Sequence, residues 1–195
     1  MNDDRMYTID VQGIDMSGLR LDGRILDIGG GGEGIVGQVL GEKVISIDSR
    51  SDELKEAADG PLKIMMDACD LKFLDNTFDA ATSFFTLMYI EKHYHQKVFE
   101  EIYRVLKEEG TFIIWDVVIS KYQNEDKDIF VVPLDIKLKD KNVTTAYGVM
   151  WNQAEQDMHY YMKLGREAGF EVIESKDNNR VYTIKFKKSD KSQRG

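Results

Sequence analysis

Residues 25–34, ILDIGGGGEG, form the segment whose residue types most directly suggest chemistry. A ligand can lie against the backbone only where no Cβ fills the space, and glycine meets that condition. Asp27 precedes the glycines by two residues; a carboxylate there opposes a pyrophosphate and attracts a cation that carries an amino group and a sulfonium. The residues predicted to bind such a cation are Asp27, Gly29, Gly30 and Gly31. Two structural alternatives stay open: a tight strand-to-helix turn, and a carboxylate that only binds loop amides.

Two more acids end apolar runs further along the chain. Asp48 ends VISID, 21 residues after Asp27, and a carboxylate at that distance can accept hydrogen bonds from both hydroxyls of a ribose. The adjacent Ser49 is assigned to the same site. Asp67 ends the next run, where it can accept from an adenine amino group, and Ala68 leaves room for the ring. Alternatively, Asp48 caps a following helix and Asp67 is an ordinary loop residue.

Asp116 is the first candidate for a catalytic residue. It lies at the carboxyl end of the apolar run 111–118, and ligands of open α/β sheets bind at that end of the strands. A carboxylate that removes a proton from a substrate contributes typically about 10²–10⁴-fold to the rate. Asp116 can equally serve to orient the segment that follows it. His93 and His95 are expected on a helix surface, and no spacing of His, Cys and Asp predicts a metal site.

The arrangement of apolar segments predicts an α/β fold. Short β-rich runs alternate with helical patterns, as in a parallel sheet covered by helices; the runs are 24–28, 43–48, 63–66, 78–85 and 111–118. An apolar stripe over 98–106 predicts a helix that ends at Gly110. Runs 170–175 and 180–186 flank a turn too short for a crossover, so they must be antiparallel. We expect a Rossmann-like, mostly parallel seven-stranded sheet with an antiparallel C-terminal hairpin and helices on both faces.

Residues 1–195 are expected to form a single domain with a substrate-side insertion at about 120–152. Within the insertion, 130–138 and 143–150 suggest a hairpin. It contains four aromatic residues, Tyr122, Phe130, Tyr147 and Trp151. They either cover the ligand site or form a small core of their own.

Four segments together carry a resemblance to a known family: LDIGGGGEG, VISID, DACDLKFLDNTFD and RVLKEEGTFIIWD. In these the chain resembles the class I S-adenosylmethionine (SAM)-dependent methyltransferases, in particular the small-molecule branch that includes enzymes of ubiquinone and menaquinone biosynthesis. It departs from the family pattern at Glu33, where the third glycine of the motif usually stands, and at Met88 and Tyr89, where the family often has histidines.

The resemblance implies a cofactor and a set of contacts. The cofactor would be SAM, with S-adenosylhomocysteine (SAH) as product. Asp67 and Ala68 would line the adenine, and Phe84 and Phe85 would offer backbone carbonyls to the methionine amino group. The chain would then transfer a methyl group to a small molecule that the sequence does not identify. The alternatives are an NAD-dependent oxidoreductase or epimerase and a non-catalytic SAM-binding module.

Composition limits the partners. A net charge of −9 over 195 residues repels polyanions, so neither nucleic acid nor an anionic membrane is expected as a partner. No apolar run approaches the roughly 20 residues that cross a bilayer. The single cysteine and an N-terminus without a signal-peptide profile predict a cytoplasmic protein. The sequence gives no indication of an oligomeric state.

Overall fold

A computed structural model describes residues 3–122 and 126–189; residues 1–2, 190–195 and three residues of the expected insertion, 123–125, lie outside it. The main sheet has seven strands in the order β10-β11-β7-β6-β3-β4-β5. The strands are β3 (Ile25–Ile28), β4 (Val44–Asp48), β5 (Leu62–Met65), β6 (Phe78–Phe84), β7 (Leu106–Val117), β10 (Phe170–Asn178) and β11 (Val181–Lys188). Strands β3 to β7 pair in parallel, and β11 runs antiparallel to both β7 and β10. The expected fold class is confirmed.

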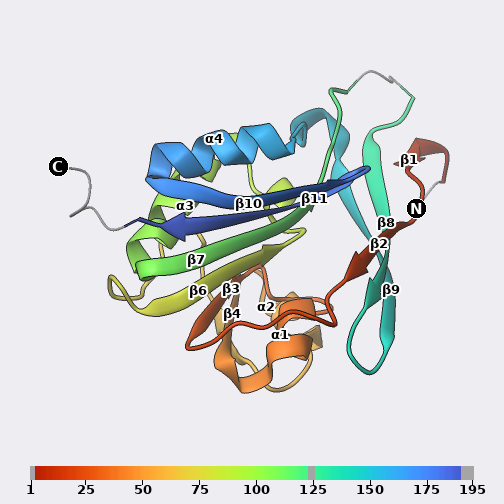
Figure 1. Cartoon of the computed structure of the whole chain (residues 1–195). Helices are drawn as coiled ribbons and strands as arrows, with labels where there is room; N and C mark the ends of the chain where they lie inside the picture. The colour runs from red at the N-terminus through yellow and green to blue at the C-terminus, as the bar shows by residue number, and fades with distance from the viewer. Residues whose placement is uncertain (1–2, 123–125, 190–195) are drawn as a thin grey trace.

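Helices cover both faces of this sheet (Figure 1). Helices α3 (Lys92–Val105) and α4 (Met158–Ala168) pack on one face, where their buried residues share a core with β3, β6 and β7. Helix α1 (Ile35–Leu40) contributes to the core of the other face, and α2 (Ser51–Glu56) packs against β4 and β5. Four single 3₁₀ turns are η1 (Asp3–Arg5), η2 (Gly41–Lys43), η3 (Leu87–Tyr89) and η4 (Trp151–Gln153). Burial on two sides explains the almost continuous apolar runs of the central strands.

The predicted end of the helix before β7 is wrong. Helix α3 ends at Val105, and the strand begins at Leu106, which already pairs with Phe78. Gly110 lies within the strand, where an added Cβ would stand 2.7 Å from the carbonyl oxygen of Lys107. Gly110 therefore allows the backbone to pass close to the Lys107 carbonyl, directly after Glu109, which has a left-handed φ. It does not end a helix.

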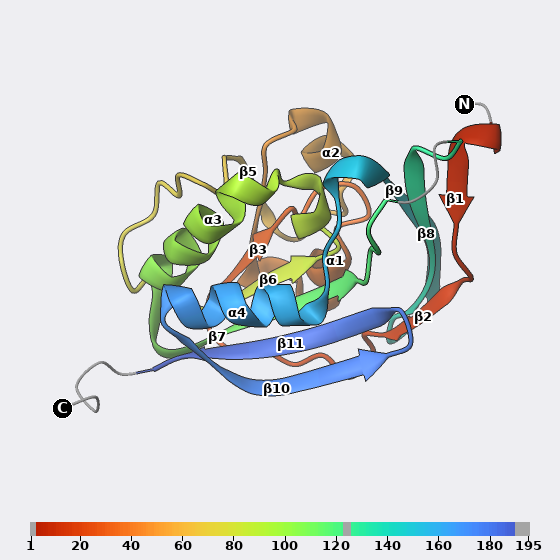
Figure 2. The ribbon, with the colours of Figure 1, turned by 90° about the horizontal axis from the view of Figure 1, so that it is seen from above.

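A second, four-stranded sheet stands beyond the carboxyl ends of the parallel strands (Figures 1 and 2). The expected hairpin is present as β8 (Ile129–Lys137) and β9 (Asn142–Met150), an antiparallel pair. Two N-terminal strands that the sequence analysis did not predict, β1 (Met6–Thr8) and β2 (Gln12–Asp15), pair in parallel with β8. The buried face of β8 joins the same core as β3, α1 and the end of β7. The insertion therefore packs on the main sheet together with the N-terminal segment.

No helix in the two described ranges is long and apolar enough to span a membrane.

Candidate functional site

The glycine loop between β3 and α1 is held tightly by its neighbours. Gly29 has a φ of 72°, and a Cβ on it would lie 2.2 Å from the Thr86 side chain. A Cβ on Gly31 would lie 2.5 Å from the Cβ of Glu53 and 2.8 Å from Asp48 Oδ2. The amides of Gly29 and Gly30 both donate to the carbonyl of Ile47, at 2.8 and 3.0 Å. The glycines are thus required by the packing of the loop itself, and that packing brings the loop backbone against the Asp48 carboxylate.

Asp27 is a buried carboxylate at the base of this loop. Its side chain is 2% exposed, and Thr82 Oγ1 on the neighbouring strand donates to Asp27 Oδ1 at 2.7 Å. A Cβ on Gly30 would lie 2.7 Å from Asp27 Oδ2, so the second oxygen faces the loop. Burial raises the pKa of Asp27 to about 7, against the lowering effect of the Thr82 hydrogen bond, and the charge of Asp48 adds to the rise. A cation bound beside Asp27 would stabilise the ionised carboxylate and so offset the effect of burial on its pKa.

The other two acids lie on adjacent strand ends. Asp48 Oδ1 accepts from the Arg50 amide at 2.9 Å and shapes the turn before α2, whose N-cap residue is Arg50. The amide of Met66 donates to the Asp48 carbonyl at 2.9 Å, which places Asp67 directly beside this strand end. Asp67 is exposed, and its Oδ1 accepts from the Cys69 amide at 2.8 Å. Of their predicted neighbours, Ser49 is exposed and Ala68 is half-buried.

The end of β6 closes the site on the other side. Phe85 adopts a φ of 48°, a left-handed conformation that is uncommon for a bulky residue and concentrates at functional sites. Its amide donates to the Trp115 carbonyl at 2.8 Å. The Phe84 carbonyl accepts from Thr86 Oγ1 at 3.1 Å. The same Thr86 side chain packs against Gly29, so the end of β6 and the glycine loop are in direct contact.

Asp116 lies apart from these residues. By strand alternation its side chain projects onto the α3–α4 face together with Phe112 and Ile114, and it is fully buried. Its Oδ1 accepts from the Val117 amide at 2.8 Å and from Gln156 Nε2 at 2.7 Å, while Oδ2 has no hydrogen-bond partner in the described part of the chain. Burial raises its pKa to about 7, although both hydrogen bonds lower it.

The surface position expected for His95 is wrong. His95 is 2% exposed; its Nδ1 lies 2.9 Å from the Tyr160 hydroxyl, and its Nε2 lies 3.0 Å from the Leu87 carbonyl. It therefore ties α3 to α4 and to the turn after β6. His93 is exposed beside Glu91. Within residues 3–122 and 126–189, no group of three His, Cys, Asp or Glu residues is arranged to hold a metal ion.

Three residues that contact the candidate site are not among the predicted binding residues: Thr82, Glu33 and Tyr147. Thr82 holds Asp27 across two strands. Glu33, in the glycine loop, accepts hydrogen bonds from Thr145 and Tyr147 on β9. The position of Glu33 among glycines is a sequence signal that its side chain has a specific hydrogen-bond partner. Its partners lie more than a hundred residues away along the chain, so only the fold reveals them.

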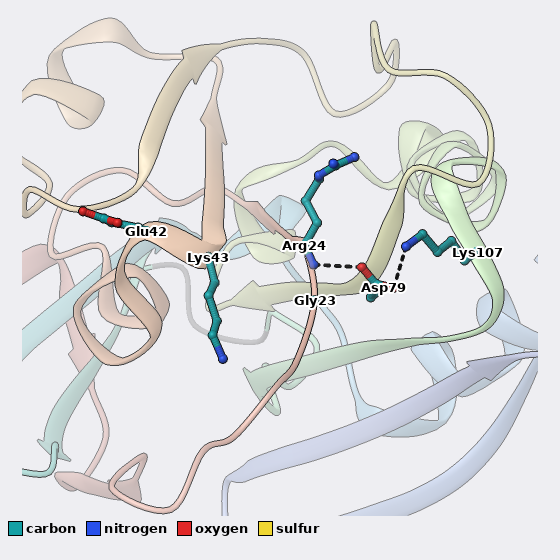
Figure 3. Close-up of a pocket in the computed structure, with 6 residues that line it drawn as sticks. All are labelled: Gly23, Arg24, Glu42, Lys43, Asp79 and Lys107. Atoms are coloured by element: carbon teal, nitrogen blue, oxygen red, sulfur yellow. Dashed lines mark hydrogen bonds and ion pairs between the residues drawn. The ribbon is translucent and has the colours of Figure 1, made fainter.

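A separate polar hollow of about 430 Å³ lies at the opposite, amino end of the parallel strands (Figure 3). Its central acid, Asp79, accepts from the Arg24 amide at 2.8 Å and from Lys107 Nζ at 2.6 Å. The Arg24 side chain points away from this pair. Since its central charge is already paired within the protein, we assign no function to this hollow.

Comparison with known proteins agrees with this geometry. Residues 26–114 match a family model described as a methyltransferase domain. The chain is 32% identical over 111 residues to the sterol 4-C-methyltransferase strm-1 of Caenorhabditis elegans; the match covers 57% of this chain and 32% of that protein. The chain thus spans about a third of the length of this curated relative.

Solved structures share the fold at low sequence identity. A SAM-dependent methyltransferase of Methanosarcina mazei superposes with a TM-score of 0.65 at 17% identity, covering 88% of this chain and 94% of that one. The [4+2]-cyclase SpnF superposes with a TM-score of 0.64 at 17% identity, covering 87% and 76%. These two similarities establish the fold. The reaction must be inferred from the residues of the site.

Proposed function

We propose that this chain is a class I SAM-dependent methyltransferase, which binds SAM at the carboxyl ends of β3, β4 and β6 and transfers the methyl group to a small-molecule acceptor; the methyltransferase-domain match and the shared fold support this. The observation that carries the proposal is the buried carboxylate of Asp27 behind the glycine loop. A carboxyl group in this position suits a ligand with an ammonium and a sulfonium, and disfavours a pyrophosphate.

Each predicted contact has a place in this proposal. Asp27 and the carbonyls of Phe84 and Phe85 would take the methionine end, and Asp48 with Ser49 would take the ribose. Asp67 and Ala68 would line the adenine, since they follow the adjacent strand end. Gly29, Gly30 and Gly31 would let the loop backbone approach the ligand, in addition to fitting between Thr86, Ser46 and Glu53.

The chain's own task is to align the acceptor and exclude water, because SAM supplies an already activated methyl group for in-line displacement. The second sheet supports this role, since it covers the strand ends that would hold the donor (Figure 2). The rings of Phe85 and Tyr147 lie 5.7 Å apart beside the glycine loop. Aromatic faces near a sulfonium are favourable by roughly 0.5–2 kcal/mol.

The acceptor is proposed to be small and not a nucleic acid or membrane surface, in line with the net charge of −9. The relation to a sterol C-methyltransferase makes sterols the first class to test, followed by phenols and amines. The resemblance to quinone-biosynthesis enzymes stays a prediction, as does a cytoplasmic location.

A catalytic role for Asp116 stays a prediction with mixed support. Its pKa near 7 and its unpartnered Oδ2 suit a general base. Its complete burial on the α3–α4 face instead favours a role in joining β7 to the segment before α4 through Gln156.

Calorimetric titration with SAH tests the donor site. We expect the wild type to bind SAH, and Asp48→Ala to lose on the order of 1.5–3 kcal/mol, or roughly 10- to 150-fold in affinity, because the ribose hydroxyls lose a charged acceptor. Asp22→Ala, an exposed acid before β3, is the matched control and should bind as the wild type does. Binding of NAD without binding of SAH would replace this proposal by the oxidoreductase alternative.

Activity needs its own measurement, because a [4+2]-cyclase shares this fold. Methyl-labelled SAM is incubated with sterol, phenol and amine panels, and labelled product is sought by mass spectrometry. Methyl transfer supports the enzyme. Tight SAH binding with no transfer to any panel would favour the non-catalytic SAM-binding module.

A further inference from the structure

The glycine loop and the second sheet are joined by one side chain. Glu33 stands between Gly32 and Gly34, which have left-handed φ values of 56° and 55°. Its Oε1 accepts from Thr145 Oγ1, and its Oε2 accepts from the Tyr147 hydroxyl at 2.9 Å. Thr145 and Tyr147 are alternate residues of β9 and therefore share the strand face that meets the main body. Both carboxylate oxygens are thus committed to one strand of the covering sheet.

We propose that Glu33 is a positioning residue that couples the donor loop to β9 and so fixes Tyr147 as a wall of the acceptor site. This inference rests on the function proposed above. It adds that occupation of the loop by the donor is transmitted to the sheet that covers the acceptor.

Tyr147 is held at three points. Its hydroxyl is bound by Glu33, its ring lies 5.7 Å from the ring of Phe85, and its backbone pairs with Val132 in the middle of β8. Burial and the charge of Glu33 raise the pKa of Tyr147 above its ordinary value, so the hydroxyl remains a proton donor. A side chain fixed in this way presents one defined surface to whatever lies between β9 and the strand ends.

Tyr89 extends the same wall. It follows β6 in the turn η3, and its hydroxyl lies near the backbone of Gly148, the residue after Tyr147. Its side chain is half exposed, in contrast to the neighbouring Met88. Phe85 and Tyr89 from the segment after β6, and Tyr147 from β9, thus bring aromatic groups near Glu33. The hydrogen bond from Tyr147 to Glu33 sets the distance between the Tyr147 ring and the glycine loop.

The response of β9 to ligand distinguishes this coupling from a simple structural clamp. A clamp would stabilise β9 equally with and without ligand. A coupling residue on the donor loop makes the order of β9 depend on whether the donor site is filled, because a ligand that further rigidifies the loop also rigidifies the Glu33 carboxylate that binds both β9 hydroxyls.

Hydrogen–deuterium exchange on the full chain tests this, with SAH as the probe. In the wild type we expect SAH to slow exchange over residues 142–150 by at least about tenfold. In Glu33→Ala the unliganded strand should exchange faster, and the SAH-dependent slowing of β9 should be lost while that of the glycine loop remains. Glu33 itself does not have a left-handed φ, so alanine fits its backbone.

Graded variants keep the test independent of folding. Tyr147→Phe retains the ring contact with Phe85 and loses one hydrogen bond, and Glu33→Gln retains size and an acceptor oxygen; both should give intermediate SAH-dependent slowing. Thr144→Val, on the exposed face of β9, should behave as the wild type. An SAH effect on β9 that is unchanged in Glu33→Ala overturns the coupling. Absence of SAH binding by the wild type, measured first by calorimetry, overturns the proposed function instead.

Discussion

At the scale of single residues, the decisive feature is a carboxyl group that the fold has taken out of water. Asp27 gains one hydroxyl hydrogen bond and loses its solvent, which raises its pKa to about 7. A bound ammonium group would favour the ionised form and lower that pKa again. The donor site is therefore expected to release a proton when it fills at mildly acid pH.

This gives a pH prediction for ligand binding. Between pH 5.5 and 7, SAH affinity should rise with pH by up to about tenfold per unit and then level off, because only ionised Asp27 attracts the amino group. Calorimetry in buffers of different ionisation enthalpy measures the released proton directly. Asp27→Asn should bind weakly and with no such pH dependence, and an equally steep profile in that variant would assign the titration to another group.

Asp116 gives a second residue-scale prediction, for stability. Its pKa is raised from an ordinary value near 3.8 to about 7, so its contribution to folding is fully present below about pH 4 and is lost as pH rises to 7. Asp116→Asn should therefore become more stable relative to the wild type between pH 5 and pH 8, as measured by urea denaturation. A pH-independent difference would contradict the burial of an ionisable group at this position.

The same variant separates the two roles of Asp116 once an acceptor is known. A general base predicts a loss of about 10²–10⁴-fold in kcat. A residue that only joins β7 to Gln156 predicts nearly unchanged kcat in the molecules that remain folded.

At the scale of elements, α4 approaches β11 through a glycine. A Cβ on Gly165 would lie 2.3 Å from the ring of Phe186, which is itself surrounded by the rings of Phe99, Phe112 and Phe170. The ring therefore has no room to withdraw. Gly165 sets the distance between the helix and the antiparallel hairpin.

Gly165→Ala should destabilise the protein by roughly 1–3 kcal/mol through overpacking, even though alanine is about 1 kcal/mol better in a helix. Urea denaturation measures the difference. Gly13→Ala is the control, because a Cβ at Gly13 meets nothing within 4 Å. A stabilised Gly165→Ala would contradict the close packing of α4 on the hairpin.

Most elements of the main sheet are predictable from sequence, for a physical reason. Strands β3, β6 and β7 are buried on both faces, so their apolar runs are nearly continuous and their polar ends mark the binding edge. Strands β1 and β2 have only three and four residues and gain their order from pairing with β8. The sequences of β1 and β2 are too short to show a strand pattern, so they do not indicate that these strands pair with β8.

The same limit applies within the site. Asp27 and Asp48 follow from their places at strand ends, and the structure brings both to the glycine loop. The contact between Glu33 and Tyr147 spans 114 residues and links a loop to an insertion, so no local pattern specifies it. The burial of His95 likewise depends on how α4 packs, since Tyr160 supplies its partner.

At the scale of the whole molecule, the two sheets have different roles in forming the candidate site. The main sheet presents its strand ends and glycine loop, and the N-terminal strands combine with β8 and β9 to cover them (Figure 1). The covering sheet shares one apolar core with the main sheet, and Glu33 adds a polar connection at the site itself. This arrangement would allow the proposed donor and acceptor to lie together between the two sheets.

The most direct test of the central claim is a crystal structure of the protein with SAH. We predict that the amino group of the ligand lies beside Asp27 and the end of β6, that its ribose hydroxyls bind Asp48, and that its sulfur is directed toward Phe85 and Tyr147. A ligand bound elsewhere, or a dinucleotide whose pyrophosphate lies over the glycine loop while SAH fails to bind, would contradict it.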